Sequence, residues 1–255
     1  MKIISYNVNG IRAAIKKDLA LWIENEKPDV FCIQETKAHQ EQVDLTAFEQ
    51  MGYHIHWFSA EKKGYSGVAI FSLQKPDNVV KGIGIDKYDR EGRNIRIDFG
   101  DLSILNAYFP SGTTGDIRQD FKEEYLGDIQ MFINDLKKER PRLILVGDYN
   151  ICHTDIDIHN PKKQQKTSGF LPHERQWVSN FISSGFVDSF RLYHSEPHRY
   201  SWWSYRAGSR PKNLGWRIDY QMVSEPLRER ISSADILDKV VHSDHCPTVL
   251  EIKEN

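Results

Sequence analysis

The stretch Arg142–Asn150, RLILVGDYN, decides how the rest of the chain is interpreted. Residues 143–146 are apolar without alternation, which is typical of a strand buried on both faces of a covered sheet. Asp148 and Asn150 follow Gly147 at the end of this strand. Such a pair either forms a polar site at the rim of a sheet or caps a turn through its own backbone. The rest of the chain has to decide between these two interpretations.

The composition is that of a globular protein with a substantial core. The chain has 255 residues, of which 39% are hydrophobic and 27% are charged. Its apolar runs are too short for a transmembrane helix. Three scattered cysteines argue against a disulfide framework or a zinc site, so we expect a reducing, cytoplasmic location. With a net charge of -2, any polyanionic partner has to be bound by local basic clusters.

Apolar periodicity predicts strands and helices that interleave without a strict βαβ rhythm. Residues 94–99 and 102–108 form the strongest predicted hairpin, around a Gly-Asp turn. About ten strands and four or five helices indicate one domain over residues 1–255, with two sheets and the helices outside. Helices are predicted at residues 11–26, 43–51, 117–139 (with Ile117 in its core stripe) and 172–184, a long functional loop at 151–171, and further strands at 2–5, 29–34, 53–59, 68–73, 199–206, 215–223, 231–236 and 246–252.

Polar residues stand where several of these predicted strands begin or end. Each could be a cap, a turn residue or a satisfied core group. Their number favours a shared site at one rim of the sheets. The residues are Asn7, Glu35, Tyr108, the Asp148/Asn150 pair, Asp219 and the Asp244-His245 pair.

Four of these residues are carboxylates, and they would repel one another at one rim unless a cation or a histidine neutralised them. Oxygen ligands without a cysteine or histidine pair at zinc spacing favour Mg²⁺ or Mn²⁺. A carboxylate beside His245 could hold one tautomer and raise its pKa. Such groups suit charge stabilisation at a phosphoryl centre.

Five motifs occur in order along the chain: YNVNGIR (6–12), QETK (34–37), GDYN (147–150), GWRIDY (215–220) and SDHCP (243–247). On these motifs the sequence resembles the exonuclease III/AP endonuclease family, within the endonuclease/exonuclease/phosphatase superfamily. The SDH and GD-x-N pieces are shared across the superfamily. The GWRIDY strand, the loop from Asn160-Pro161-Lys162 to Ser168-Gly169-Phe170 and the following HERQ (173–176) are particular to its DNA-repair branch.

The resemblance implies a deoxyribonuclease I-like fold, a four-layer α/β/β/α sandwich of two mixed sheets packed face to face. It also implies an Mg²⁺-dependent monomer, in which Mn²⁺ can substitute, acting on double-stranded DNA. The implied reaction is hydrolysis of the phosphodiester 5′ to an abasic site, leaving a 3′-hydroxyl, with some 3′→5′ exonuclease and 3′-end trimming activity.

The resemblance also implies roles for the rim residues. Asp148 would orient or deprotonate the attacking water, and Asn150 would hold the water or the phosphate. His245, paired to Asp219, would contact the scissile phosphate, and Tyr108 would bind it or assist the leaving oxygen. The base and the number of metal ions stay open. Glu35 would be the principal metal ligand with Asn7 beside it, and Asp244 would support a second or moving metal. The full set of residues predicted at the metal site is Asn7, Glu35, Asp148, Asn150, Asp244 and His245.

A second group of residues is predicted to bind the DNA. Trp202, Trp216 and Ile218 match positions where the family forms an apolar pocket for a baseless sugar, whereas Trp203 is expected in the core. An abasic nucleotide costs less to flip out of the stack than an intact one. Basic clusters that include Lys163 and Arg206 would track phosphates without reading bases. Ser168 leaves room for an abasic sugar, and Ser111 stands where several relatives carry Asn or Gln.

Two alternatives remain at this stage. The superfamily chemistry could act on inositol phosphates or phospholipids, against which the repair-type loop and the GWRIDY strand argue. The fold could also be a non-catalytic DNA-binding scaffold, although every expected catalytic position is occupied.

Overall fold

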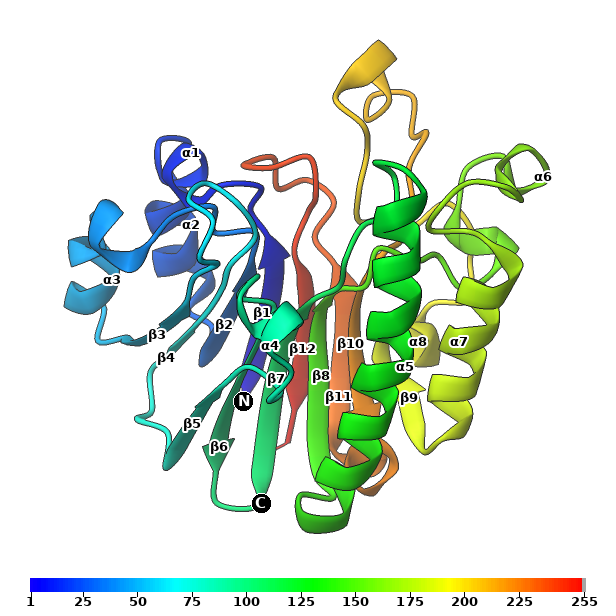
Figure 1. The fold of residues 1–255 in the computed structure, drawn as a ribbon. Helices are drawn as coiled ribbons and strands as arrows, with labels where there is room; N and C mark the ends of the chain where they lie inside the picture. The colour runs from blue at the N-terminus through cyan, green and yellow to red at the C-terminus, as the bar shows by residue number, and fades with distance from the viewer. Residues whose placement is uncertain (254–255) are drawn as a thin grey trace.

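The computed structural model describes residues 1–253, which form two six-stranded mixed sheets packed face to face (Figure 1). The first sheet has the order β11 (Ile231–Ile236), β12 (Thr248–Ile252), β1 (Lys2–Asn7), β2 (Val30–Gln34), β4 (Val68–Ser72) and β3 (His54–Phe58). The second has the order β5 (Asn78–Lys81), β6 (Asn94–Phe99), β7 (Leu102–Tyr108), β8 (Arg142–Asp148), β10 (Asp219–Ser224) and β9 (Phe186–Asp188).

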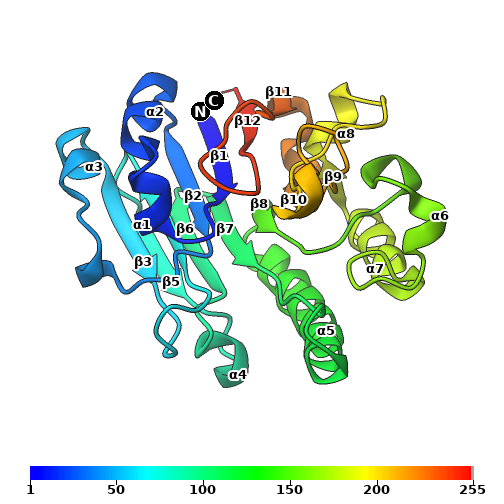
Figure 2. The ribbon, with the colours of Figure 1, turned by 90° about the horizontal axis from the view of Figure 1, so that it is seen from above.

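Helices cover the outer faces of both sheets, so the predicted four-layer sandwich is confirmed (Figure 2). The α-helices are α1 (Ile11–Ile15), α2 (Leu19–Glu26), α3 (Thr46–Gln50), α4 (Asp86–Asp89), α5 (Asp116–Glu139), α6 (Pro161–Gln164), α7 (Pro172–Ser183) and α8 (Ser189–Tyr193). Short 3-10 turns lie at η1 (Gln40–Gln42), η2 (Asp155–Asp157), η3 (Arg206–Gly208) and η4 (Glu225–Arg230). None of the helices within residues 1–253 has the length and apolar character needed to cross a membrane.

Three apolar layers hold the sandwich together. Successive side chains of a strand point to opposite faces, so each central strand contributes to two layers. The layer between the sheets includes Ile3, Cys32, Ile70, Ile95 and Val146. The layer under α1–α3 includes Ile4, Phe31, Phe71, Ile11 and Phe48, and the layer under α5 and α7 includes Leu105, Leu145, Ile129, Val178 and Phe181.

Strand β8 shows why its sequence has no polar alternation. Leu143 and Leu145 pack under α5 and α7, whereas Ile144 lies between the sheets, and all three side chains are completely buried. The prediction of a strand buried on both faces is confirmed. Gly147, the residue before the end of this strand, has φ 139°, and a Cβ there would lie 1.8 Å from the backbone oxygen of Ala107 on β7. Only glycine fits this approach of the two backbones.

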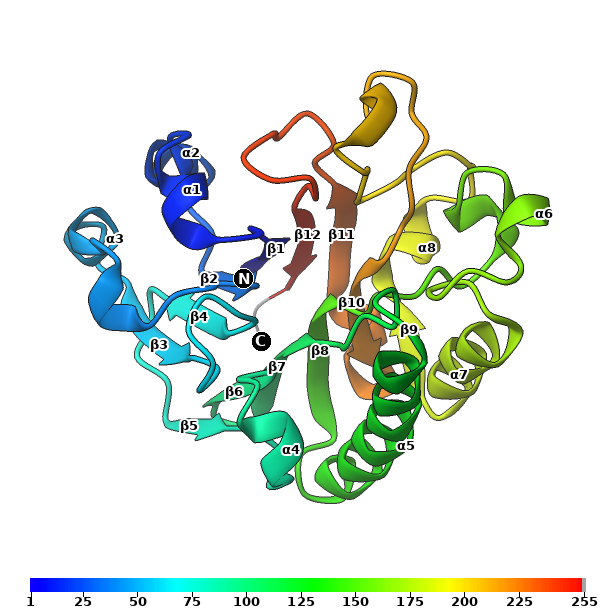
Figure 3. The same cartoon turned by 45° about the horizontal axis from the view of Figure 1, so that its top comes forward.

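The topology brings the predicted polar residues to one edge. Strands β1 and β2 run parallel, as do β7 and β8, so all four end there. Strand β12 is antiparallel to β1 and β10 is antiparallel to β8, so both begin there. Figure 3 shows the connections that lead into β10 and β12 beside each other at this edge. We call it the site edge.

The predicted helix over residues 11–26 is wrong, because two short helices replace it. Asp18 has φ 65°, a left-handed conformation that Asp tolerates better than most residues, and α2 starts after it. Ile11 and Ala14 of α1, and Leu19 and Ile23 of α2, still pack on the same sheet face. The apolar spacing of residues 11–26 therefore predicted correctly which side chains are buried, but it did not predict the break between α1 and α2.

Two further expectations also differ from the structure. Ile117 is 85% exposed, because the first turn of α5 stands beyond the end of the sheet (Figure 1). Residues 199–206 and 215–218 are not strands. Trp202 and Trp216 exchange backbone hydrogen bonds of 2.9 Å as an isolated bridge, and Trp202 makes a second bridge to His245. The backbone groups of residues 201–203 thus find partners in two different segments, so no continuous strand pairing forms here.

Candidate active site

The site edge brings together residues from both sheets. Asn7 is the last residue of β1, and Glu35 follows β2 directly. Tyr108 and Asp148 end β7 and β8 as partners in the same register, and Asp219 starts β10 opposite Asp148. The prediction that polar side chains at strand ends converge is therefore confirmed for these positions.

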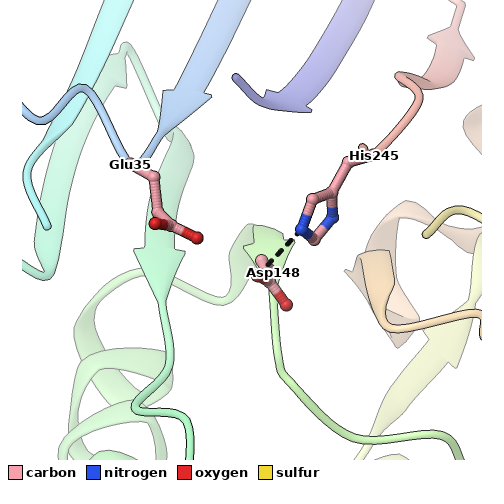
Figure 4. Close-up of side chains that lie close together, drawn as sticks. All are labelled: Glu35, Asp148 and His245. Carbon is pink, nitrogen blue, oxygen red and sulfur yellow. Dashed lines mark ion pairs between the residues drawn. The ribbon is translucent and has the colours of Figure 1, made fainter. Parts of the chain in front are cut away.

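Glu35, Asp148 and His245 form the tightest group, which we call the charged cluster (Figure 4). One potential ligand atom from each lies within 4.8 Å of the other two. The Nε2 atom of His245 is 3.9 Å from Oδ2 of Asp148. Glu35 comes from the first sheet and Asp148 from the second, so the cluster spans the interface between the sheets.

Asn7 links the two carboxylates of the charged cluster. Its Nδ2 atom donates to Oε1 of Glu35 at 2.9 Å and to Oδ2 of Asp148 at 2.8 Å. Its Oδ1 atom accepts from the backbone N–H of Asn9 at 2.9 Å. Asn7 therefore presents its amide donor to the carboxylates and uses its oxygen in a backbone turn.

Lys37 is a site residue that the sequence analysis did not assign. Its Nζ atom lies 2.7 Å from Oε2 of Glu35 and also donates to Oδ1 of Asn9. Glu35 itself has φ 53° in the turn that brings Lys37 back toward it. The only sequence signal is the QETK motif, in which Lys37 stands two residues after Glu35.

Asp219 and His245 form a buried pair. The Nδ1 atom of His245 is 2.9 Å from Oδ2 of Asp219, which also accepts from Ser201 Oγ at 2.6 Å. Burial opposes a charge on His245, but Asp219 and then Asp148 outweigh it and raise the pKa of His245 to about 10. The pairing uses Nδ1 and leaves Nε2 as the ring nitrogen nearer to Asp148.

Asp148 and Asn150 form a turn cap and also belong to the polar site at the rim of the sheet, so both interpretations of the RLILVGDYN stretch hold. The Oδ1 atom of Asp148 accepts from the backbone N–H of Asn150 at 2.8 Å, which is a turn cap. The Nδ2 atom of Asn150 also donates to the Phe109 carbonyl at 3.0 Å and to Asp148 Oδ2 at 3.3 Å. Burial, followed by the charge of Asp219, raises the pKa of Asp148 above its ordinary value.

Asp244 lies beside the charged cluster but is not part of it. Its Oδ1 atom accepts from Asn9 Nδ2 at 2.9 Å, and its Oδ2 atom accepts from the Trp202 indole at 3.0 Å. Burial opposes the charge on Asp244, but His245 and these hydrogen bonds lower its pKa. Both oxygens are thus already used to hold neighbouring side chains.

Tyr108 lies between the charged cluster and a buried arginine. Burial, and then the charges of Glu35 and Asp148, raise the pKa of its phenol well above the ordinary value. The guanidinium of Arg93 lies 5.1 Å from the Tyr108 ring and donates to the Tyr108 carbonyl at 2.8 Å. Tyr108 is therefore a neutral hydroxyl donor at neutral pH.

A cleft of about 570 Å³ joins the charged cluster to most of the predicted substrate-binding residues. Trp202, Trp216 and Ile218 form one side of it, which we call the apolar wall; the two indoles meet edge to face, with centroids 6.1 Å apart. Trp203 is buried in a separate core, as expected. The cleft is lined by Glu35, Tyr108, Ser111, Thr113, Asp148, Asn150, Thr167, Ser168, Trp202, Ser204, Arg206, Trp216, Ile218, Asp244 and His245.

Lys163 is not brought into this group. It lies exposed on α6, outside the residues that line the cleft. Asn7 and Asp219 are also absent from the lining, but each is hydrogen-bonded to a member of the charged cluster.

Arg217 supports the apolar wall from behind, and the sequence analysis gave it no role. It stands between Trp216 and Ile218 with only 1% of its side chain exposed. Its Nε atom pairs with Asp157 at 2.6 Å and its Nη2 atom pairs with Asp188 at 2.7 Å. The buried ion pairs fix the segment that carries two of the three wall residues.

These groups suit one class of reaction. Carboxylates that can hold a hard cation, a charged imidazole and neutral amide and hydroxyl donors all face one cleft. Such a set stabilises charge that develops on phosphoryl oxygens during hydrolysis. The geometry is therefore that of a phosphoester hydrolase.

A profile of the Endonuclease/Exonuclease/phosphatase family matches residues 4–245, and the chain belongs to this family. It is 44% identical over 254 residues to an exodeoxyribonuclease of Bacillus subtilis (strain 168), with 99% of both chains covered. It is 39% identical to the DNA repair nuclease APEX1 of Danio rerio, over 98% of this chain and 81% of that protein. The solved structure of an AP endonuclease from Archaeoglobus fulgidus matches with a TM-score of 0.92 and 30% identity, covering 100% of both chains.

The comparisons confirm the resemblance found in the motifs, and the chain is a hydrolytic nuclease. The family is metal-dependent, and the donor set of this chain fits a divalent cation. Glu35 and Asp148 offer carboxylate oxygens within 4.8 Å of each other, the donor type that hard cations prefer.

Proposed function

We propose that this DNA repair nuclease hydrolyses the phosphodiester 5′ to an abasic site in duplex DNA. The observation that carries the proposal is one cleft with the charged cluster at its base and the apolar wall at its side. Ser168, a small residue, lies in the same lining. An extruded sugar without a base can rest against the indoles while its phosphate reaches the cluster.

The side chains divide the reaction between them. Asp219 keeps His245 protonated, so the imidazolium stabilises the charge that grows on the phosphate oxygens. Asp148 and Asn150 orient the attacking water, which displaces the 3′ oxygen of the upstream nucleotide and leaves a 3′-hydroxyl. The hydroxyl group of Tyr108 donates a hydrogen bond to the phosphate or to the leaving oxygen.

Mg²⁺ is the proposed cation, and Mn²⁺ is a substitute for it. When bound, such a cation lowers the pKa of a coordinated water and neutralises phosphate charge. Glu35 is the first proposed ligand, with Asp148 opposite it in the charged cluster. In this arrangement Asn7 holds the two carboxylates in place through its Nδ2 atom.

Binding of DNA rests on phosphate contacts rather than on base recognition. Arg206 in the cleft and the exposed Lys163 on α6 are proposed to meet the backbone on either side of the lesion. The chain is proposed to act as a monomeric catalytic domain in the cytoplasm. Its three free, buried cysteines are consistent with a reducing compartment.

A 3′→5′ exonuclease activity is the second candidate. The name of the Bacillus relative favours it. We propose that the same cleft takes a frayed 3′ end beside the charged cluster.

The test is a time course on two matched duplexes, one with a tetrahydrofuran abasic analogue and one intact. We expect rapid incision of the first with Mg²⁺, a product that a polymerase can extend, and no incision with chelator. Absence of incision with both Mg²⁺ and Mn²⁺ would refute the proposal. If inositol phosphates or phospholipids were hydrolysed faster than the abasic duplex, the phosphatase alternative would replace the proposed function.

A further inference from the structure

An ion pair between Lys122 of α5 and Glu174 of α7 lies outside the cleft and has no part in the chemistry above. Both side chains have an exposed fraction of 0%, and Nζ lies 2.6 Å from Oε1. Burying two charges costs solvation energy that their attraction often only balances, and an apolar pair of similar volume is often as stable. The ion pair by itself is therefore weak evidence of a contribution to stability. The other hydrogen bonds of the two side chains show what else the pair does.

Lys122 reaches the segment that carries Asn150. Its Nζ atom donates to the backbone carbonyl of Asn150 at 2.9 Å. Asn150 has φ 53°, and its amide group is held on the other side by Phe109 and Asp148. The lysine therefore fixes the peptide group that follows Asn150, whose side chain lines the cleft.

Glu174 reaches a second part of the same cleft. Its Oε2 atom accepts from the backbone N–H groups of Gly169 at 2.6 Å and Leu171 at 3.0 Å. Gly169 follows Ser168 and packs tightly: a Cβ there would lie 2.9 Å from the Asn150 carbonyl and 3.1 Å from the ring of Trp216. One buried carboxylate thus holds the segment that presents Ser168 and supports the apolar wall.

We propose that Lys122 and Glu174 are a positioning pair for the active site. Through one buried contact they set the place of the Asn150 amide relative to Asp148, and the place of the Ser168–Gly169 segment relative to the apolar wall. The kinetic part of this inference rests on the proposed function. Misplacing a reacting group by about 1 Å costs on the order of 10²-fold in rate.

The first variant is Lys122→Met combined with Glu174→Gln, which removes both charges. The glutamine carbonyl can still accept from Gly169 and Leu171, but the hydrogen bond to Asn150 is lost. With an unchanged Tm, we expect kcat on the abasic duplex to fall at least about tenfold, while KM changes less than about threefold. If the pair had only a structural role, the variant would lower Tm, and kcat and KM of the folded protein would stay unchanged.

The second variant, Lys122→Met combined with Glu174→Leu, removes both sets of contacts. We expect kcat to fall and KM to rise, because the apolar wall loses its support. Lys137→Met is the matched control. It removes another α5 lysine, whose Nζ donates to the backbone carbonyl of Ser184 at the far end of α7. The control should keep kcat and KM within about twofold of the unaltered chain.

Amide hydrogen exchange on the unaltered chain gives a readout that needs neither a variant nor a substrate. The N–H groups of Gly169 and Leu171 should exchange as slowly as those of β8, although they lie in a loop. If the chain fails to incise abasic DNA, the proposed function fails, and exchange still decides whether the contact exists. Fast exchange at Gly169 overturns the inference, as do folded double variants with unchanged kcat and KM.

Discussion

Replacing Asp157 by asparagine should destabilise the whole chain while changing a single atom of the side chain. Asp157 is fully buried in the turn η2 and pairs with Arg217 Nε at 2.6 Å and Arg191 Nη2 at 2.5 Å. Its Oδ2 atom also accepts from the backbone N–H and the hydroxyl of Thr154. The substitution leaves Arg217 with only Asp188 to balance its buried charge.

Breaking one partner of a buried ion pair costs about 3–5 kcal/mol. For a chain of this size, 1 kcal/mol corresponds to roughly 2–4 °C in Tm, so Asp157→Asn should lower Tm by about 6–20 °C. Asp155→Asn is the matched control, because Asp155 lies in the same turn, is 63% exposed and pairs with the partly exposed Arg175. An exposed pair contributes about 0–1 kcal/mol.

The pH dependence of the difference has a definite sign. Burial opposes the charge on Asp157, but Arg217 and Arg191 outweigh it and hold its pKa well below the ordinary value. A carboxyl whose folded pKa is depressed contributes stability above its unfolded pKa and loses it as pH falls toward the folded pKa. The Tm gap between the unaltered chain and Asp157→Asn should therefore be constant from about pH 5 to 8 and narrow below about pH 4.

Differential scanning calorimetry of the three proteins between pH 3.5 and 8 provides the measurement. A Tm for Asp157→Asn within 2 °C of the unaltered chain at pH 7 would show that the buried network does not hold this segment. A gap that widened on acidification would show that the sign of the pKa shift is wrong.

Three further predictions concern the site itself. His245→Ala should lower kcat by about 10²–10³-fold in a chain that still folds, because an imidazolium that acts on developing charge is lost; a loss under threefold would remove His245 from the reaction. Its Tm should fall as well, because Asp219 loses its buried partner. Glu35→Gln should raise the Mg²⁺ concentration for half-maximal rate at least about tenfold, measured by metal titration after chelation, and an unchanged titration would exclude Glu35 as the main ligand. Gly147→Ala should give insoluble protein or a Tm lowered by more than about 10 °C, because its Cβ would lie 1.8 Å from the Ala107 oxygen; a soluble variant with the ordinary Tm would contradict the close approach of β7 and β8.

Much of the fold follows from local patterns that encode burial directly. The hairpin β6–β7 has the predicted bounds, because alternating apolar residues flank a Gly-Asp turn. The polar ends of β1, β2, β7 and β8 predicted the charged cluster in part, since parallel neighbours end at the same edge. Strands β5 and β9 had no such pattern because they are short and lie at the sheet margins.

The supports of the site could not be predicted in the same way. Lys122 and Glu174 are 52 residues apart, and Asp157 and Arg217 are 60 residues apart. A charged residue in an amphipathic helix or a loop is ordinarily assigned to solvent. Only the packing of α5 against α7, and of η2 against the segment before β10, shows that these charges are buried and paired.

The place of β1 between β12 and β2 has a consequence for biosynthesis. His245 and the strand that follows it must emerge from the ribosome before the first sheet closes around β1. A nascent chain that already displays Glu35 and Asp148 still lacks the imidazole that completes the charged cluster. In the proposed mechanism hydrolytic competence therefore arises only after residue 245 has been made, and shorter translation products carry the carboxylates of the charged cluster without its imidazole.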